Sequence, residues 1–161
     1  ITTLLDIEAT VLFLAYRKME NSMRLLLKTA FVLCLLGSQV FAGGDAGAGE
    51  KAYKKCKSCH SIVDNDGNVI LKGGKTGPNL YGLAGRIAAS VDGFKYGKSL
   101  KALGETGFAW SEDDFISYVA DPTKFLRASL DDSKARSKMS YKLKKEKDAQ
   151  DIWAYLTSVS E

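Results

Sequence analysis

The chain has 161 residues, of which 45% are hydrophobic and 26% charged, with 15 Gly, 2 Pro, 3 Cys and a single His. This length and composition indicate one globular domain and exclude a collagen-like, disordered or polytopic membrane chain. The excess of 23 Lys and Arg over 19 Asp and Glu gives a net charge of only +4, so we expect no nucleic-acid partner. The single His excludes any site that needs two imidazoles from one chain.

Residues 23–42 have the three-part pattern of a secretory signal peptide. Positive charge at Met23–Lys28 precedes an apolar run over residues 29–36, and Val40-Phe41-Ala42 matches a cleavage site. We therefore expect a signal peptide over residues 23–42, cleaved near Ala42, and a protein located in the periplasm.

The remaining chain divides into an extension and one domain. Residues 1–22 are interpreted as an upstream extension of doubtful origin, because either Met19 or Met23 can start translation. Residues 43–161 form the expected domain. A retained membrane anchor is the alternative to cleavage, although the uncharged stretch 29–44 is shorter than the ~20 apolar residues of a spanning helix.

The domain begins with a predicted helix over residues 46–57. Asp45 is a favourable N-cap. Small and apolar side chains follow at helical spacing, at Gly49, Ala52, Tyr53 and Cys56. A Gly-rich and turn-rich region over residues 65–85 follows, and it has no sustained alternation, so no large sheet is expected.

Three more helices are predicted in the second half of the chain. Ser111 caps a helix that runs to about Ala120, and Asp121-Pro122 starts a short one with Pro at its first position. After a lysine-rich loop over residues 134–145, a last amphipathic helix covers residues 145–158. The fold class is therefore all-α, with three to five helices and long irregular loops. So much loop in a small domain indicates that something other than side chains fills its centre.

One motif carries the chemistry. Cys56-Lys57-Ser58-Cys59-His60 is C-x-x-C-H, the attachment pattern of c-type haem. Thiols one helical turn apart can add to the two vinyl groups at one haem edge, and the adjacent imidazole can reach the iron from one face. We expect one covalently attached haem c per chain, with iron bound by His60.

Competing interpretations of this motif lack partners. A zinc site requires four nitrogen or sulfur ligands, and residues 43–161 contain two Cys and one His. A thioredoxin-type pair follows a strand, whereas a helical pattern precedes Cys56. A plain disulfide across two residues would leave His60 unexplained.

Met139 is the candidate for the second axial ligand of the iron. It is the only Met after the signal segment, and its neighbours Ser137, Lys138, Ser140 and Lys142 are polar. The alternative is that Met139 fills a gap in the core. Ligation by His60 and Met139 would favour reduced iron and raise the reduction potential.

Four motifs together resemble the class I c-type cytochromes, most closely the periplasmic cytochrome c2 and c-550 group of alpha-proteobacteria. They are Cys56–His60, Thr76–Gly82 with Gly85-Arg86, Lys138–Tyr141 and Asp151–Leu156, in the family's order. The resemblance covers essentially all of residues 43–161. It implies a class I cytochrome c fold whose helices wrap around one haem.

The resemblance also implies roles for individual residues. Pro78 would offer its carbonyl to the free ring nitrogen of His60. Arg86, Tyr96 and Trp110 would be partners of the haem propionates, although Trp110 alone could be a core aromatic. Tyr118 resembles the tyrosine that hydrogen-bonds the methionine sulfur.

Two further positions bear on packing. Gly49 with Tyr155 would form the crossing of the first and last helices. Tyr141 stands where the family usually has Phe beside the exposed haem edge, which leaves the packing of that edge open.

The implied function is that of a soluble, monomeric one-electron carrier with no substrate turnover of its own. By resemblance its donor is a quinol–cytochrome c oxidoreductase and its acceptor a terminal oxidase or photosynthetic reaction centre. These membrane complexes would dock on lysines near both axial ligands. The lysines are Lys54, Lys55, Lys57, Lys138, Lys142 and Lys144.

Three alternatives stay open at this point. A peroxidase-like enzyme would need an open distal side and an acid/base group, although no distal His exists. A haem-based binder or sensor of small ligands would have a labile Met139. A membrane-tethered carrier would retain residues 23–42.

Overall fold

The computed structural model describes residues 43–160, so the expectations for residues 1–22 and for a signal peptide over 23–42 lie outside the described residues. Within the described range the chain forms five α-helices, a short 3₁₀ helix and one two-stranded sheet. In chain order these are α2 (Ala46–Ala52), η1 (Tyr53–Lys55), β1 (Ile62–Val63), β2 (Val69–Leu71), α3 (Lys98–Glu105), α4 (Glu112–Ala120), α5 (Pro122–Ser129) and α6 (Glu146–Ser158).

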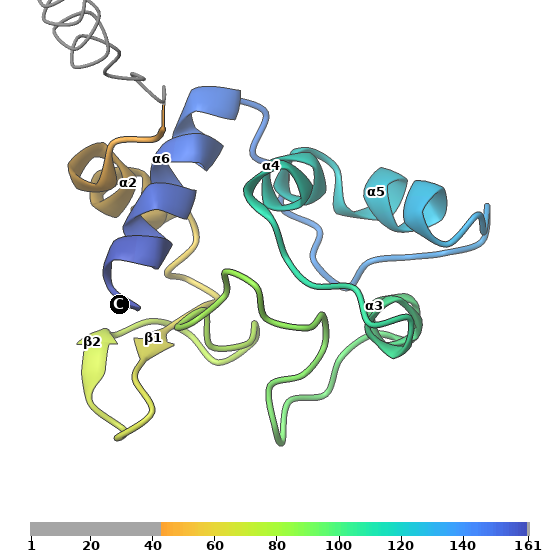
Figure 1. Ribbon diagram of the computed structural model, residues 1–161, viewed down its shortest axis with the longest axis horizontal. Helices are drawn as coiled ribbons and strands as arrows, with labels where there is room; N and C mark the ends of the chain where they lie inside the picture. The colour runs from red at the N-terminus through yellow and green to blue at the C-terminus, as the bar shows by residue number, and fades with distance from the viewer. Residues whose placement is uncertain (1–42, 161) are drawn as a thin grey trace, which may run out of the picture. The chain divides into compact units, whose positions relative to one another are not determined.

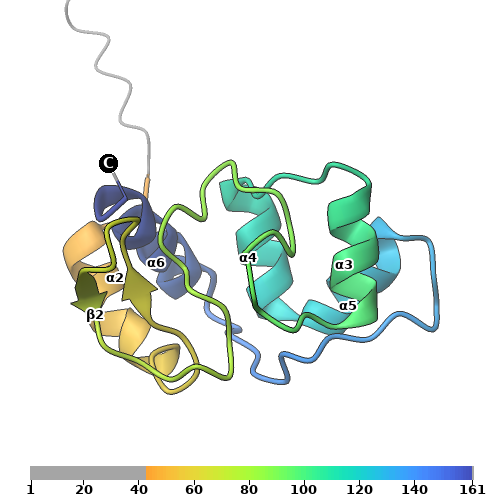
Figure 2. The same ribbon diagram turned by 90° about the horizontal axis from the view of Figure 1, so that it is seen from below.

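The helices form two groups joined by long loops. Figures 1 and 2 show α2 and α6 side by side with the β1–β2 hairpin near them, and α3, α4 and α5 grouped on the other side. Helix α4 links the groups because it contacts both α6 and α5. None of the helices in residues 43–160 has the length and apolar character needed to cross a bilayer.

The expected crossing of the first and last helices is confirmed. Gly49 of α2 is buried, and a Cβ there would overlap the backbone carbonyl of Asp151 and lie 2.8 Å from Tyr155 Cβ in α6. The rings of Tyr53 and Tyr155 meet edge to face beside it, with centroids 5.8 Å apart. The small residue in α2 thus lets the two helix backbones touch.

The predicted capping residues begin three helices as expected. The Asp45 carboxylate accepts from Ala48 N at 2.9 Å, Ser111 Oγ from Asp114 N at 3.2 Å, and the Asp121 carboxylate from Lys124 N at 3.0 Å. Pro122 occupies the first position of α5, where its missing N–H costs no hydrogen bond.

The sequence predictions were incomplete in three places. The first helix ends at Ala52, because Cys56 N donates to Tyr53 O three residues before it and tightens the chain into a 3₁₀ turn. Helix α3 was not predicted, since it starts at Gly97 with no side-chain cap. The antiparallel β1–β2 pair, Ile62 with Leu71 and Val63 with Val69, is too short to show alternation.

Replacing Gly49 by Ala should weaken the crossing of α2 and α6. Its Cβ would collide with backbone atoms that cannot move independently, so we expect the free energy of unfolding to fall by ~1–3 kcal/mol. Chemical denaturation of the purified protein measures this. Gly47→Ala in the same helix is the control: its Cβ meets only the Asp45 side chain, and Ala favours a helix over Gly by ~1 kcal/mol. Equal effects of the two substitutions would contradict the packing argument.

Candidate functional site

A cavity of about 370 Å³ lies in the middle of the described domain, a volume typical of ligand pockets. Apolar side chains from both helix groups form much of its wall. All nine residues singled out from the sequence line it: Cys56, Cys59, His60, Pro78, Arg86, Tyr96, Trp110, Tyr118 and Met139. The structure therefore brings these residues together around one space, and their roles toward a bound group stay predictions.

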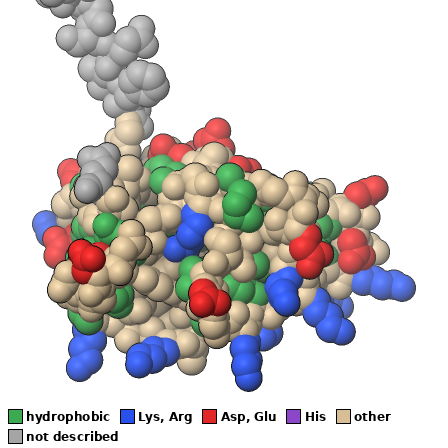
Figure 3. Space-filling view, turned by 60° about the horizontal axis from the view of Figure 1, so that its bottom comes forward, with side chains coloured by type: hydrophobic (Ala, Val, Ile, Leu, Met, Phe, Trp, Pro, Cys, Tyr) green, Lys and Arg blue, Asp and Glu red, His purple; other side chains and the backbone are tan. Residues whose placement is uncertain are grey.

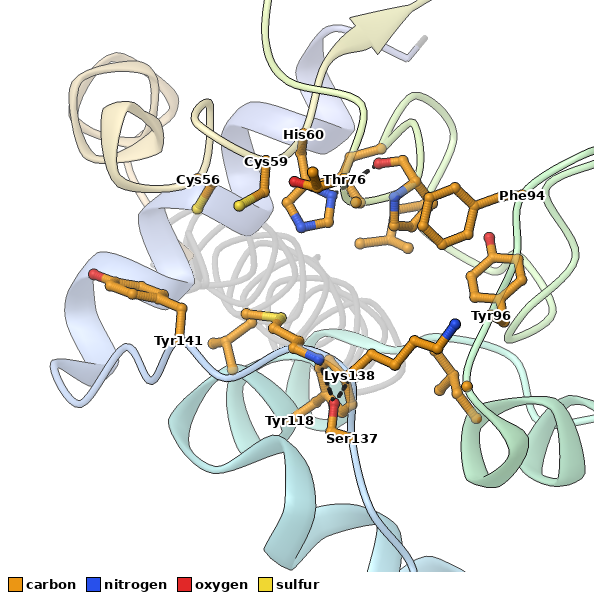
Figure 4. Close-up of a pocket in the computed structure, with 18 of the residues that line it drawn as sticks. Cys56, Cys59, His60, Thr76, Phe94, Tyr96, Tyr118, Ser137, Lys138 and Tyr141 are labelled. Atoms are coloured by element: carbon orange, nitrogen blue, oxygen red, sulfur yellow. Dashed lines mark hydrogen bonds between the residues drawn. The ribbon is translucent and has the colours of Figure 1, made fainter.

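The two cysteines stand at the edge of this cavity on the turn that follows η1. Both are free thiols, and Figure 4 shows their sulfur atoms next to the ring of His60. Cys56 is the more enclosed, and burial raises the pKa of its thiol to about 11. The hydroxyl of Thr76, followed by that of Ser58, lowers the pKa of the exposed Cys59 thiol. The turn itself is closed by Cys59 N and His60 N, which both donate to Cys56 O.

His60 is held in one orientation and one tautomer. Its Nδ1 lies 2.8 Å from Pro78 O, and because a carbonyl only accepts, Nδ1 carries the proton. Burial lowers the pKa of His60, which favours the neutral ring. The other nitrogen, Nε2, is then an unprotonated donor of an electron pair, as a metal ligand must be.

Gly77 supports this ring from behind. A Cβ at Gly77 would overlap the imidazole of His60, so the backbone of the proline loop lies directly against it. The same loop is tied to the cysteine turn by Gly77 N, which donates to Cys59 O at 2.8 Å. The absence of a side chain is thus a condition for the contact between His60 and Pro78.

The loop that carries Met139 forms the opposite wall. Figure 4 shows Ser137 and Lys138 across the cavity from His60, and Met139 follows them in the chain and lines the same cavity. Met139 is partly buried and packs against the core. Its backbone N–H donates to Ser137 Oγ at 3.0 Å.

Tyr118 has a hydrogen-bond partner in the methionine loop. Its hydroxyl lies 3.1 Å from Ser137 Oγ, and the bond to the sulfur of Met139 that the family resemblance implied stays a prediction. Ser137 thus stands between Tyr118 and Met139, and its N–H in turn donates to Thr123 Oγ1 at 3.3 Å. The reason is local, because the Ser137 hydroxyl reaches both the backbone N–H of Met139 and the hydroxyl of the buried Tyr118.

Arg86 and Tyr96 also have partners within the protein. The Arg86 guanidinium donates to Tyr81 O at 2.7 Å and to Asn79 O at 3.0 Å, and the Tyr96 hydroxyl accepts from Val91 N at 3.3 Å. These contacts hold both side chains at the cavity wall. The expected propionate contacts would be additional to them.

Trp110 belongs to an aromatic cluster in the core. Its ring is stacked on Phe125, with centroids 6.1 Å apart, and meets Tyr118 edge to face at 5.1 Å. Trp110 is buried and also lines the cavity. The interpretation of Trp110 as a core aromatic is confirmed, and its role as a partner of a haem propionate stays a prediction.

Sequence reasoning missed several residues of the site. Thr76 bonds Cys59 in the cysteine turn, Asn79 holds the proline loop, and Ser137 holds the methionine loop. Two cationic residues of the cavity wall, Lys95 and Arg136, were missed as well. Asn79 and Ser137 each lie within two residues of a predicted site residue, so polar side chains that flank such positions are the signal to follow. Lys95 carries the same signal, because it directly precedes Tyr96.

Known proteins resemble the chain along most of its length. A cytochrome c-551 of Roseobacter denitrificans is 55% identical over 134 residues, which cover 83% of this chain and 94% of the relative. Cytochrome c2 of Rhodobacter capsulatus is 50% identical over 137 residues, covering 85% and 98%. The chain belongs to the class I c-type cytochromes.

Solved structures place this cytochrome in the same group. A structure of cytochrome c2 from Rhodobacter capsulatus matches with a TM-score of 0.71 and 53% identity, covering 73% of this chain and 100% of that chain. Ferric cytochrome c-550 from Paracoccus versutus matches with a TM-score of 0.69 and 48% identity, covering 73% and 99%. The predicted family and the class I fold are confirmed. No protein-family model matches the chain.

In this cytochrome, Gly77→Ala should displace the ring of His60. We expect the ring proton signals of His60, the only His of the chain, to shift in NMR spectra and the free energy of unfolding to fall by ~1–3 kcal/mol. Gly43→Ala is the control, because a Cβ at Gly43 meets nothing within 4 Å. Unchanged His60 signals in the Gly77 variant would show that the loop accommodates a side chain.

Proposed function

We propose that this protein is a one-electron carrier that holds one haem c in the described cavity. The observation that carries the proposal is the pairing of two walls: Cys56, Cys59 and His60 on one, and Met139 on the other. Cys56 and Cys59 would hold the haem through thioether bonds, and His60 Nε2 and the Met139 sulfur would bind its iron. When bound, the haem supplies one-electron redox chemistry.

The charge of the cavity wall fits such a group. Its lining residues in the described chain include no Asp or Glu. Several cationic side chains line it instead: Lys55, Arg86, Lys95, Arg136 and Lys138. A group that carries two carboxylates, as haem does, is attracted to a cavity lined in this way, and Arg86 keeps its charge at all physiological pH values.

The protein's own part in the proposed reaction is to keep the site closed and unchanging. Leu83, Trp110, Phe115 and Ile152 are buried and line the cavity, so they exclude water from it. His60 is fixed by Pro78, and Met139 is fixed by Ser137. His60 and Met139 would both bind the iron of the haem and leave it no open position for a substrate, so we propose no enzymatic activity.

Replacing Met139 by Ala tests the proposal. The oxidised parent protein should show a sulfur-to-iron charge-transfer band and bind carbon monoxide hardly at all when reduced. The variant should lose the band and bind carbon monoxide readily, because one axial side opens. Ser140→Ala, next in the chain and exposed, should behave like the parent.

Two results would contradict the proposal that the protein is an electron carrier. A colourless protein produced with a working haem-attachment system would refute the haem. Equal carbon monoxide binding by parent and Met139→Ala would refute ligation by Met139 and favour a binder or sensor of small ligands.

We further propose that the carrier is a monomer that docks on acidic membrane complexes, a quinol–cytochrome c oxidoreductase as donor and an oxidase or reaction centre as acceptor. On the face that Figure 3 shows, Lys and Arg side chains dominate the lower margin, while Asp and Glu lie along the upper margin and across the middle of the face. This uneven distribution of charge would orient the carrier in the field of its partner.

The six lysines predicted to dock on the partners differ in the contacts that they make within the protein. Lys55 pairs with Asp148 at 2.5 Å and Lys142 with Asp121 at 2.6 Å, so their charge is partly offset. For the predicted members Lys54, Lys57 and Lys144, no ion pair is recorded among the described residues. Lys138 donates to Lys95 O at 2.9 Å, which holds both residues at the cavity wall. We therefore add Lys95 and Arg136 to the proposed docking surface.

Lys95→Glu should slow electron transfer from an isolated quinol–cytochrome c oxidoreductase. The substitution reverses the charge beside the cavity but keeps the backbone carbonyl of residue 95, to which Lys138 donates. We expect a second-order rate constant about tenfold lower at low salt, converging with the parent at 1 M salt, where the Debye length is ~3 Å. Lys51→Glu, in α2 and away from the cavity lining, is the control. An equal loss for both variants would indicate a net-charge effect instead of docking.

The location is part of the same proposal. We propose that residues 23–42 direct export, that cleavage occurs near Ala42 and that residues 43–161 act in the periplasm. The mass of the N-terminus of the exported protein distinguishes this from a tethered carrier that retains the segment.

A further inference from the structure

Two chain segments run side by side behind His60. Gly77 N donates to Cys59 O at 2.8 Å, and Leu80 N donates to Ser61 O at 3.1 Å. The bond from His60 Nδ1 to Pro78 O lies between these two contacts. The position of the Pro78 carbonyl is therefore set by how segment 77–80 is held against segment 59–63.

Asn79 extends this pairing with its side chain. Its Nδ2 donates to Val63 O at 2.6 Å, and its Oδ1 accepts from Val63 N at 3.0 Å. One amide thus binds both backbone groups of a single residue, as a neighbouring strand would. The same Oδ1 accepts from Tyr81 N at 3.1 Å, so the side chain also fixes the local turn of its own loop.

The partners of Asn79 are themselves held. Val63 is paired with Val69 across the β1–β2 hairpin. On the other side, the guanidinium of Arg86 binds Asn79 O and Tyr81 O. Asn79 therefore connects the hairpin to the loop of Pro78, and the peptide bond between Pro78 and Asn79 has little freedom to turn.

We propose that Asn79 is a positioning residue for the axial histidine, acting through the carbonyl of Pro78. This inference rests on the proposed haem. A carbonyl held against Nδ1–H makes an imidazole a more basic ligand, which favours ferric over ferrous iron and lowers the reduction potential. Releasing Asn79 weakens that hydrogen bond and raises the potential.

The test compares two variants of the complete haem-loaded protein with a matched control. Asn79→Leu keeps the approximate shape of the side chain and removes all three contacts, and Asn79→Ser is a milder change with one hydroxyl. Asn68→Ala is the control: Asn68 lies in the same hairpin and donates to Asp64 Oδ2 at 2.8 Å, but it does not contact the proline loop.

Two readouts report on the axial histidine itself. NMR of the reduced protein measures the rate at which the His60 Nδ1–H exchanges with solvent. We expect this rate to be at least tenfold higher in Asn79→Leu than in the parent. We expect the equilibrium constant for reduction to rise at least threefold, about 28 mV at 59 mV per tenfold change. Asn79→Ser should shift both in the same direction by less, and Asn68→Ala should shift neither.

Each contrary outcome has a defined meaning. A lower free energy of unfolding with unchanged exchange and unchanged potential would make Asn79 a purely structural residue and overturn the inference. Equal shifts in Asn68→Ala would overturn it too, since hairpin stability alone would then be the cause. If Asn79→Leu does not fold, the inference is tested with Asn79→Ser alone. An exchange rate and a reduction potential equal to those of the parent in Asn79→Ser would then refute it. A protein without bound haem refutes the proposed function, which is a separate result.

Discussion

The close approach of α2 and α6 at Gly49 is the constraint on which the site depends. The chain passes from α2 through one 3₁₀ turn into the Cys56–His60 segment, so the position of α2 determines where that segment starts. Asp151 strengthens the crossing: its carboxylate accepts from Asp45 N at 2.6 Å and pairs with Lys147 at 2.5 Å. Lys147 and the Asp45 amide lower the pKa of Asp151, so the carboxylate stays ionised at neutral pH.

The two walls of the cavity are built differently. Backbone carbonyls and amides hold the wall of His60, through Cys59, Ser61 and Pro78. Side-chain hydroxyls hold the wall of Met139, through the contact of Ser137 with Tyr118 and Thr123. Backbone contacts persist under most substitutions, whereas hydroxyl contacts depend on single residues. The two walls are therefore sensitive at different kinds of position: the histidine side at Gly77 and Asn79, where the backbone contacts are packed and tied, and the methionine side at the hydroxyl of Ser137.

Much of the fold and of the site could be predicted from the sequence because the signals were local. Capping residues, the C-x-x-C-H spacing and the isolated Met139 are each readable within a few residues, and the order of motifs gave the family. Helix α3 and the hairpin lacked such signals, since Gly97 provides no cap and the strands are only two and three residues long. The partner of Tyr118 and the contact of Asn79 with Val63 depend on tertiary structure, so no sequence pattern indicated them.

The hairpin has one consequence for how the protein can vary. Its tip is closed on itself, because the Asp64 carboxylate accepts from Asp66 N at 2.9 Å and Asn68 N at 2.8 Å, and residues 65–68 are exposed. Asn79 binds the backbone of Val63, the last residue of β1, so its contacts do not involve the exposed residues of the tip. Lengthening an exposed loop costs little free energy. The Asp66-Gly67 junction is therefore the natural place to graft an affinity tag or a surface-attachment linker.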